Sequence, residues 1–129
     1  MRILIIEDEE PAQKRLKKII LEVIPQTELL GCISSVDSAI HWFRSNQMPE
    51  LIFMDIQLAD GNSFDIFREV RINAPIIFIT AFDQYAIEAF KVNSIDYLLK
   101  PVNKEGLQQA YDKMIQFKIF NYKSLLIYF

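Results

Sequence analysis

The chain has 129 residues, enough for one domain that buries most of its apolar surface without disulfide support. With 51% hydrophobic and 24% charged residues and a net charge of -3, the composition argues against nucleic-acid binding by this segment itself. The chain has no apolar run of the roughly 20 residues that a membrane helix needs, no signal-peptide pattern and a single cysteine, Cys32. These features predict a cytoplasmic protein that does not contact membranes.

Short apolar runs alternate with segments of helical periodicity along the chain. Residues 3–6 form the first run, and a helix carrying Leu16, Ile19, Ile20 and Val23 follows. The second run, Glu28–Ile33, precedes a helix opened by the capping pattern of residues 34–37. The third run, Leu51–Met54, leads directly into Asp55. The first half of the chain therefore predicts three strands and two helices.

Beyond the turn pair Asp60-Gly61, the sequence predicts three more helices and two more strands. The first of these helices carries Phe64, Ile66, Phe67 and Val70 and reaches residue 73. The strands cover residues 76–79, ending at Thr80, and residues 95–99. The helix between these two strands carries Tyr85, Ala86, Ala89 and Phe90. A last helix runs from residue 103 to about residue 117.

Alternating strands and helices predict a parallel sheet, because the crossovers that join parallel strands are right-handed and carry helices to both faces. The expected architecture is an α/β, doubly wound five-stranded sheet. The pattern of elements alone leaves the strand order open.

Polar residues stand at the carboxyl ends of four of these strands. Glu7 and Asp8 follow the first strand, Asp55 the third, Thr80 the fourth and Lys100 the fifth. Ligands of open α/β sheets bind at that edge, so we expect one shared cleft. Three carboxylates repel one another unless a cation compensates them, and Mg²⁺ suits such oxygen ligands. The hydroxyl of Thr80 and the ammonium of Lys100 are suited to phosphoryl oxygens.

Four motifs in this order carry a family resemblance: Ile6-Glu7-Asp8-Glu9, Met54-Asp55-Ile56, Ile79-Thr80-Ala81 and Lys100-Pro101. With them, the chain resembles the receiver domains of two-component response regulators, and its flanking residues look like the LytTR (LytR/AlgR) type. The resemblance implies a flavodoxin-like (βα)5 receiver over residues 1–117 with strand order 2-1-3-4-5. Residues 118–129 would be an apolar tail that leads to a C-terminal LytTR DNA-binding domain outside this chain.

The resemblance also implies a role for each site residue. Asp55 would be the phosphoacceptor, receiving a phosphoryl group from a sensor histidine kinase. Asp8, Asp55 and the backbone carbonyl of Gln57 would bind Mg²⁺, with Glu7 acting through water, although most of the family has Asp at the Glu7 position. Lys100 would pair with the phosphoryl group, and its bond to Pro101 is expected to be cis.

The implied output is a switch and not an enzyme with turnover. Thr80 would move toward the phosphoryl group, and the ring of Tyr97 would rotate into the vacated space, which leads to homodimerisation and control of transcription. Gln57 and Phe82 would flank the phosphoryl group. A static core position is the alternative for Tyr97.

Two other classes of function are possible on these residues. An Mg²⁺-dependent hydrolase of the aspartyl-phosphate kind would need a second Asp two residues after Asp55, where Gln57 stands. A nucleotide-binding module would need a glycine-rich loop, and the three glycines form none. For the apolar tail, a linker and a segment that packs on a partner chain are both open.

Overall fold

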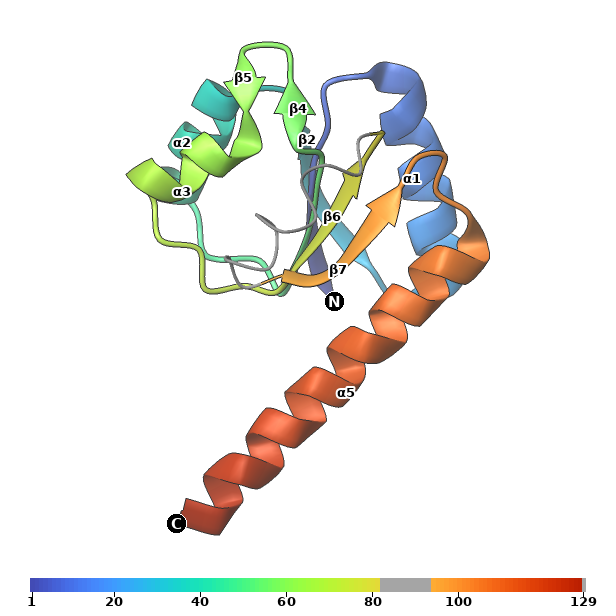
Figure 1. Ribbon diagram of the computed structural model, residues 1–129, viewed down its shortest axis with the longest axis vertical. Coiled ribbons are helices and arrows are strands. Elements are labelled where there is room, and N and C mark those ends of the chain that lie inside the picture. The colour runs from blue at the N-terminus through green and yellow to red at the C-terminus, as the bar shows by residue number, and fades with distance from the viewer. Residues whose placement is uncertain (82–93, 129) are drawn as a thin grey trace.

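The computed structural model describes residues 1–81 and 94–128, with side chains up to residue 119. Five parallel strands form the main sheet: β1 (Arg2–Ile6), β2 (Glu28–Ile33), β3 (Leu51–Met54), β6 (Ile76–Thr80) and β7 (Ser94–Leu99). Their order is β2-β1-β3-β6-β7, which confirms the expected order 2-1-3-4-5 (Figure 1). The helix expected around Tyr85, Ala86, Ala89 and Phe90 lies outside the described residues.

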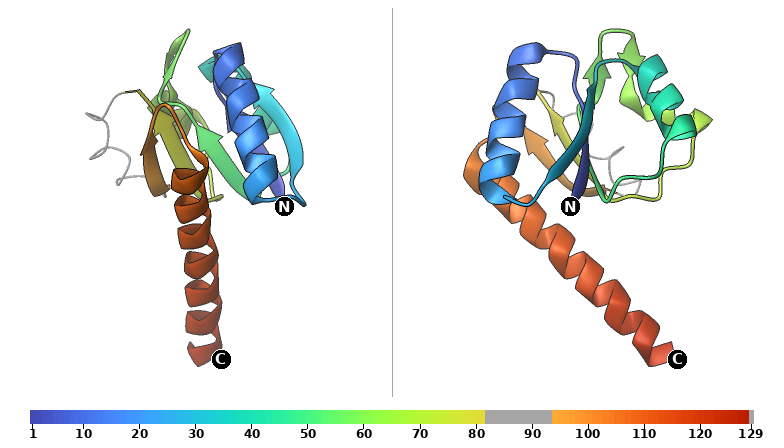
Figure 2. Two further views of the ribbon diagram at one scale, coloured as in Figure 1. Left: turned by 90° about the vertical axis from the view of Figure 1, so that its right-hand side faces the viewer. Right: turned by 180° about the vertical axis from the view of Figure 1, so that it is seen from behind.

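Helices lie on both faces of the sheet, as the doubly wound fold requires (Figures 1 and 2). One face is covered by α1 (Glu10–Val23) and the first turns of α5 (Lys104–Tyr128), and the other by α2 (Val36–Ser45) and α3 (Ile66–Glu69). Within the described residues, no helix has the length and hydropathy to span a membrane.

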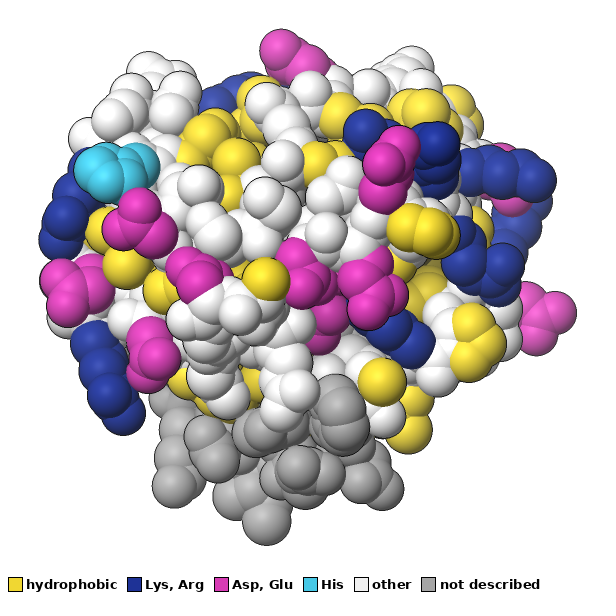
Figure 3. Space-filling model, turned by 90° about the horizontal axis from the view of Figure 1, so that it is seen from above, with side chains coloured by type: hydrophobic (Ala, Val, Ile, Leu, Met, Phe, Trp, Pro, Cys, Tyr) yellow, Lys and Arg dark blue, Asp and Glu magenta, His cyan; other side chains and the backbone are white. Residues whose placement is uncertain are grey.

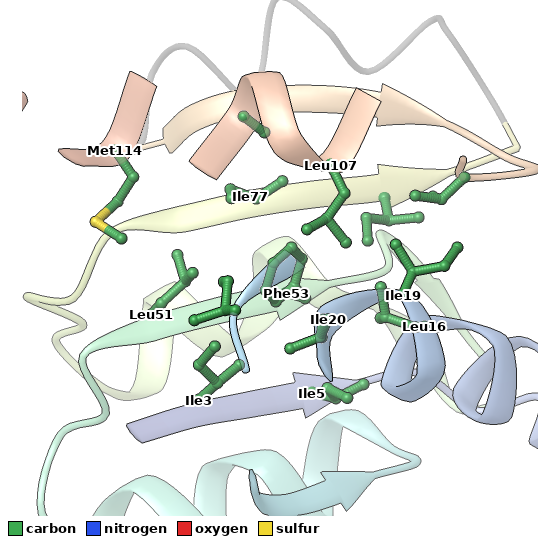
Figure 4. Close-up of a cluster of buried hydrophobic side chains, with 14 residues drawn as sticks. Ile3, Ile5, Leu16, Ile19, Ile20, Leu51, Phe53, Ile77, Leu107 and Met114 are labelled. Atoms are coloured by element: carbon green, nitrogen blue, oxygen red, sulfur yellow. The ribbon is translucent and has the colours of Figure 1, made fainter. Parts of the chain in front are cut away.

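The central strands β1, β3 and β6 are apolar except at Arg2, which starts β1, and Thr80, which ends β6, because both faces of the sheet are buried there. In β1, Ile3 and Ile5 point to the α1/α5 face, and Leu4 and Ile6 point to the α2/α3 face. Figure 4 shows the first of these two layers, where Phe53 of β3 lies among side chains of α1 and α5. Side chains that alternate between two buried faces explain why the runs lack a polar period.

Asp60 at the tip of a small hairpin anchors the start of α2. The hairpin joins β4 (Gln57–Leu58) to β5 (Gly61–Asn62), and Gly61 supplies the φ of 151° at the turn. The Asp60 carboxylate accepts hydrogen bonds from the backbone N–H groups of Val36 (2.8 Å) and Asp37 (3.1 Å). These N–H groups have no partner within their helix, so the hairpin tip and α2 hold each other in place.

Replacing Asp60 by alanine is expected to lower the free energy of unfolding by about 1 kcal/mol at neutral pH, the usual effect of losing a helix cap. The bond from Val36 lowers the pKa of Asp60. The contribution of Asp60 to the free energy of unfolding is therefore complete above the unfolded pKa of about 3.9, and it disappears as the pH falls through the lower folded pKa. Urea titrations of both proteins along a pH series would measure this. Equal stability at neutral pH would contradict the capping role.

Two predicted helices have different limits in the structure. The segment after Gly61 forms a 3-10 turn, Ser63–Asp65, and then the single turn of α3, which ends at Glu69 and not near residue 73. Val70 is already extended, with φ -137°. The last helix is longer than expected, because α5 continues beyond residue 117 to Tyr128 as one element.

Candidate functional site

Acidic side chains gather on the face where the carboxyl ends of the strands emerge (Figure 3). Glu7, Asp8 and Asp55 each place a carboxylate oxygen within 4.8 Å of the others. Beside them is a cavity of about 340 Å³, lined by Asp8, Glu9, Asp55, Gln57, Leu58, Ala81 and Lys100. The chain thus brings together the acids that were predicted from separate strands.

Backbone hydrogen bonds at the strand ends fix the positions of Glu7 and Asp55. The N–H of Asp55 donates to Ile6 O and that of Glu7 to Ile33 O, both at 2.8 Å. These bonds extend the hydrogen bonding of the parallel sheet by one residue, so the backbone of each acid is held in a fixed position at the edge of the sheet. Both residues are almost fully buried, since 3% of the surface of Glu7 and 6% of that of Asp55 is exposed.

Lys100 links these two buried carboxylates. Its Nζ lies 2.8 Å from Asp55 Oδ2 and 2.5 Å from Glu7 Oε1. The backbone N–H of Lys100 donates to Thr80 O at 2.8 Å, which ties the end of β7 to the end of β6. The Lys100–Pro101 peptide bond is cis.

The protonation of the site depends on burial and on charge together. Burial raises the pKa of Asp8, and a hydrogen bond with Glu7 and the Glu7 charge raise it further. Burial alone would lower the pKa of Lys100, but its hydrogen bonds to Asp55 and Glu7 outweigh that effect and raise it. One ammonium therefore compensates two buried carboxylates, and the third acid holds its proton more readily than a free aspartate.

The donor set fits a hard divalent cation such as Mg²⁺. Three carboxylates that converge from two strand ends offer only oxygen ligands, and a partly open cavity leaves room for the waters that Mg²⁺ retains. Glu7, Asp8 and Asp55 are the residues that would hold the cation. Gln57 lines the same cavity, and its N–H lies 3.4 Å from Asp55 Oδ1.

Thr80 and Tyr97, the two residues expected to relay a signal, lie at different depths. Thr80 ends β6 and is completely buried. Tyr97 stands opposite Phe78 in the β6–β7 pairing, is half-buried, and packs on the α2/α3 side of the sheet. Phe82, expected to flank the phosphoryl group, lies outside the described residues.

The support of Glu7 was not predicted. Glu7 Oε2 accepts the N–H of Glu9 at 3.1 Å, and the Gln13 amide donates to Glu7 O at 2.6 Å. Both donors come from the start of α1, one turn apart. Only the closeness of residues 9 and 13 to the end of β1 could have indicated this role.

Comparison with known proteins gives the class of this domain. The response regulator receiver domain family matches residues 3–112. The chain therefore belongs to the family of response regulator receiver domains, which are signalling domains of two-component systems. The fold and the cluster of acids at the strand ends agree with that membership.

Within the family, the chain is similar to LytT-type regulators. It is 36% identical over 116 residues to the sensory transduction protein LytT of Bacillus anthracis, a match that covers 88% of this chain and 46% of that protein. It is also 33% identical over 121 residues to the transcriptional regulatory protein BtsR of Salmonella typhi, covering 90% and 48%. The chain thus spans about half the length of these curated relatives.

A solved structure shows the same fold. The response regulatory domain of mrkE from Klebsiella pneumoniae is 29% identical and superposes with a TM-score of 0.76. The match covers 90% of this chain and 96% of the solved one.

Proposed function

We propose that this domain is a phosphorylation switch in which Asp55 accepts a phosphoryl group from the phosphohistidine of a sensor histidine kinase in the cytoplasm. The observation that carries this proposal is the position of Lys100 Nζ, 2.8 Å from Asp55 Oδ2 and shared with Glu7. A cation placed there pairs with an oxygen of Asp55 and with the oxygens of an incoming phosphoryl group. Family membership supports the identity of the donor.

The chemistry is positioning combined with charge neutralisation, as in phosphoryl transfer generally. The carboxylate oxygen of Asp55 that is not paired with Lys100 attacks the phosphorus in line as the bond to the histidine nitrogen breaks, and the imidazole leaves. Lys100 would neutralise charge on the equatorial oxygens, and the Thr80 hydroxyl would donate to one of them. Mg²⁺ bound at Glu7, Asp8 and Asp55 would supply Lewis-acid stabilisation of the same charge. The domain catalyses this transfer, and its later hydrolysis, only on itself.

The readout runs through β6 and β7. Lys100 joins the acids to Thr80 through its backbone N–H, and Tyr97 lies on the neighbouring strand opposite Phe78. A phosphoryl group that draws Thr80 toward Asp55 changes the packing space beside Tyr97, a two-state element of the kind that charge can bias. The consequence is homodimerisation and control of an output domain. A LytTR DNA-binding domain reached through residues 118–129 is the output that the LytT-type relatives support.

Intact-mass spectrometry tests the central step. Incubation with Mg²⁺ and acetyl phosphate is expected to add one phosphoryl group to the wild-type chain and none to Asp55→Asn. Asp60→Asn is the matched control, because Asp60 is a carboxylate outside the cavity and should leave the mass gain unchanged. A wild-type chain that gains no mass with any small phosphodonor, or an Asp55→Asn variant that still gains it, would overturn the proposal.

A further inference from the structure

A second cavity lies on the other side of Lys100, between α1 and the segment that joins β7 to α5. Its volume is about 350 Å³, and its walls are mainly apolar: Ala12, Leu16, Ile79, Pro101 and Val102. Glu7 and Lys100 also line this cavity, and both belong to the acidic site described above. A cavity of this size, with apolar walls and a few converging polar groups, has the character of a small-molecule site.

The walls are held in place by a contact across the cavity. Arg15 of α1 donates from Nε to Val102 O at 2.8 Å, and Figure 1 shows α1 beside the chain that follows β7. Leu16 and Val102 are buried, whereas Arg15 is exposed and marks the side open to solvent. The cavity is therefore built by two elements that a hydrogen bond keeps at a fixed separation.

The charges around this cavity favour an anionic group at its open side. Glu7 is compensated, since Oε1 binds Lys100 and Oε2 accepts the N–H of Glu9. The Arg15 side chain donates one hydrogen bond, from Nε to Val102 O, and none of the described carboxylates forms an ion pair with its guanidinium. The planar fork of a guanidinium is suited to a carboxylate or sulfonate.

We propose that this cavity binds a small monoanion with an aromatic or branched aliphatic body, the body between Leu16 and Val102 and the acid group on Arg15. The proposal goes beyond the switch, because it requires neither Mg²⁺ nor phosphorylation. The bound molecule would contact Lys100, which also binds Asp55, so that the occupied cavity and the acidic site share a residue.

Titration with 3-phenylpropionate, followed by amide NMR shifts, tests the proposal on the whole chain. The expected result is saturable binding with a dissociation constant of about millimolar, reasonable for so small a ligand, and with shifts centred on residues 12–16 and 102. Ala12→Leu fills the cavity and should abolish binding. Lys18→Leu adds the same side chain on the exposed side of α1 and should bind as the wild type does.

The charge of the ligand gives a second readout. The wild type should prefer 3-phenylpropionate over 3-phenylpropylamine by roughly twofold to fivefold, the range for an exposed ion pair, and Arg15→Gln should remove the preference while binding remains. No saturable shift in the wild type would overturn the site, and so would binding that survives in a folded Ala12→Leu. A preference unchanged in Arg15→Gln would overturn the assigned anion.

Discussion

Replacing Lys100 by methionine is expected to lower the free energy of unfolding by about 3–5 kcal/mol in the absence of Mg²⁺, because two buried carboxylates lose their cation. The side chains of Glu7 and Asp55 are only 4% and 8% exposed, and that of Lys100 is 22% exposed, so solvent screens these charges little. Methionine retains most of the length of the side chain and removes its charge. Urea denaturation with and without Mg²⁺ would measure the effect.

Mg²⁺ should recover part of this loss, because a cation bound by Glu7, Asp8 and Asp55 replaces the missing charge. Lys104→Met is the matched control and should change stability little. The side chain of Lys104 is 62% exposed, and its Nζ lies 4.0 Å from Glu22 Oε2. A loss below about 1 kcal/mol, the range of surface pairs, would contradict the buried bridge.

The pH dependence of the wild type has a definite sign. The folded pKa of Lys100 is raised, so its contribution is complete below the unfolded value of about 10.4 and is lost as the pH rises through the folded pKa. The stability of Lys100→Met should therefore not show this loss at alkaline pH.

Replacing Phe78 by alanine should cost about 3–5 kcal/mol, as removal of a buried aromatic ring does. Phe78 is completely buried in β6, and its ring centroid lies 5.4 Å from that of Phe64 and 6.5 Å from that of Phe67. A domain of this size has a total stability of about 5–15 kcal/mol, so the change removes a large fraction of it. Chemical denaturation monitored by circular dichroism is the measurement.

Phe117→Ala is the control for the aromatic deletion. Phe117 lies on α5 with 42% of its surface exposed, and its removal leaves no cavity in the sheet core. A similar loss in both variants would show that the ring of Phe78 does not carry the packing between the sheet and α3.

The strands and the site edge could be predicted because their causes are local. A strand buried on both faces must be apolar throughout, as Leu51–Met54 shows, and a polar residue at its end must emerge at the edge of the sheet. Asp55 and Lys100, 45 residues apart, could therefore be placed in one cleft before their contact was seen. The strand order came from the family resemblance, since the residues alone do not determine it.

The sequence predicts the structure less well where an apolar residue is buried without belonging to a regular helix or strand. Phe64, Ile66, Phe67 and Val70 have helical spacing, yet they are apolar because they cover the sheet, and the helix ends at Glu69. The turn at Asp60-Gly61 is predicted by the sequence, but the strands β4 and β5 on either side of it are not, because two residues are too few to show a period. Side-chain contacts such as Gln13 to Glu7 O depend on how α1 leaves β1, which local sequence does not encode.

Because α5 is one continuous helix, a movement of the sheet under its first turns would be transmitted along its whole length. Its 25 residues correspond to about 37 Å of helix, and those of its described side chains that pack on the sheet core lie between Leu107 and Ile115. In Figures 1 and 2 the rest of the helix extends away from the sheet. The helix contains no proline, and its one glycine, Gly106, lies in the first turn, so the rest has no hinge. A small tilt of the helix at Leu107 and Met114 would therefore produce a larger displacement at Tyr128.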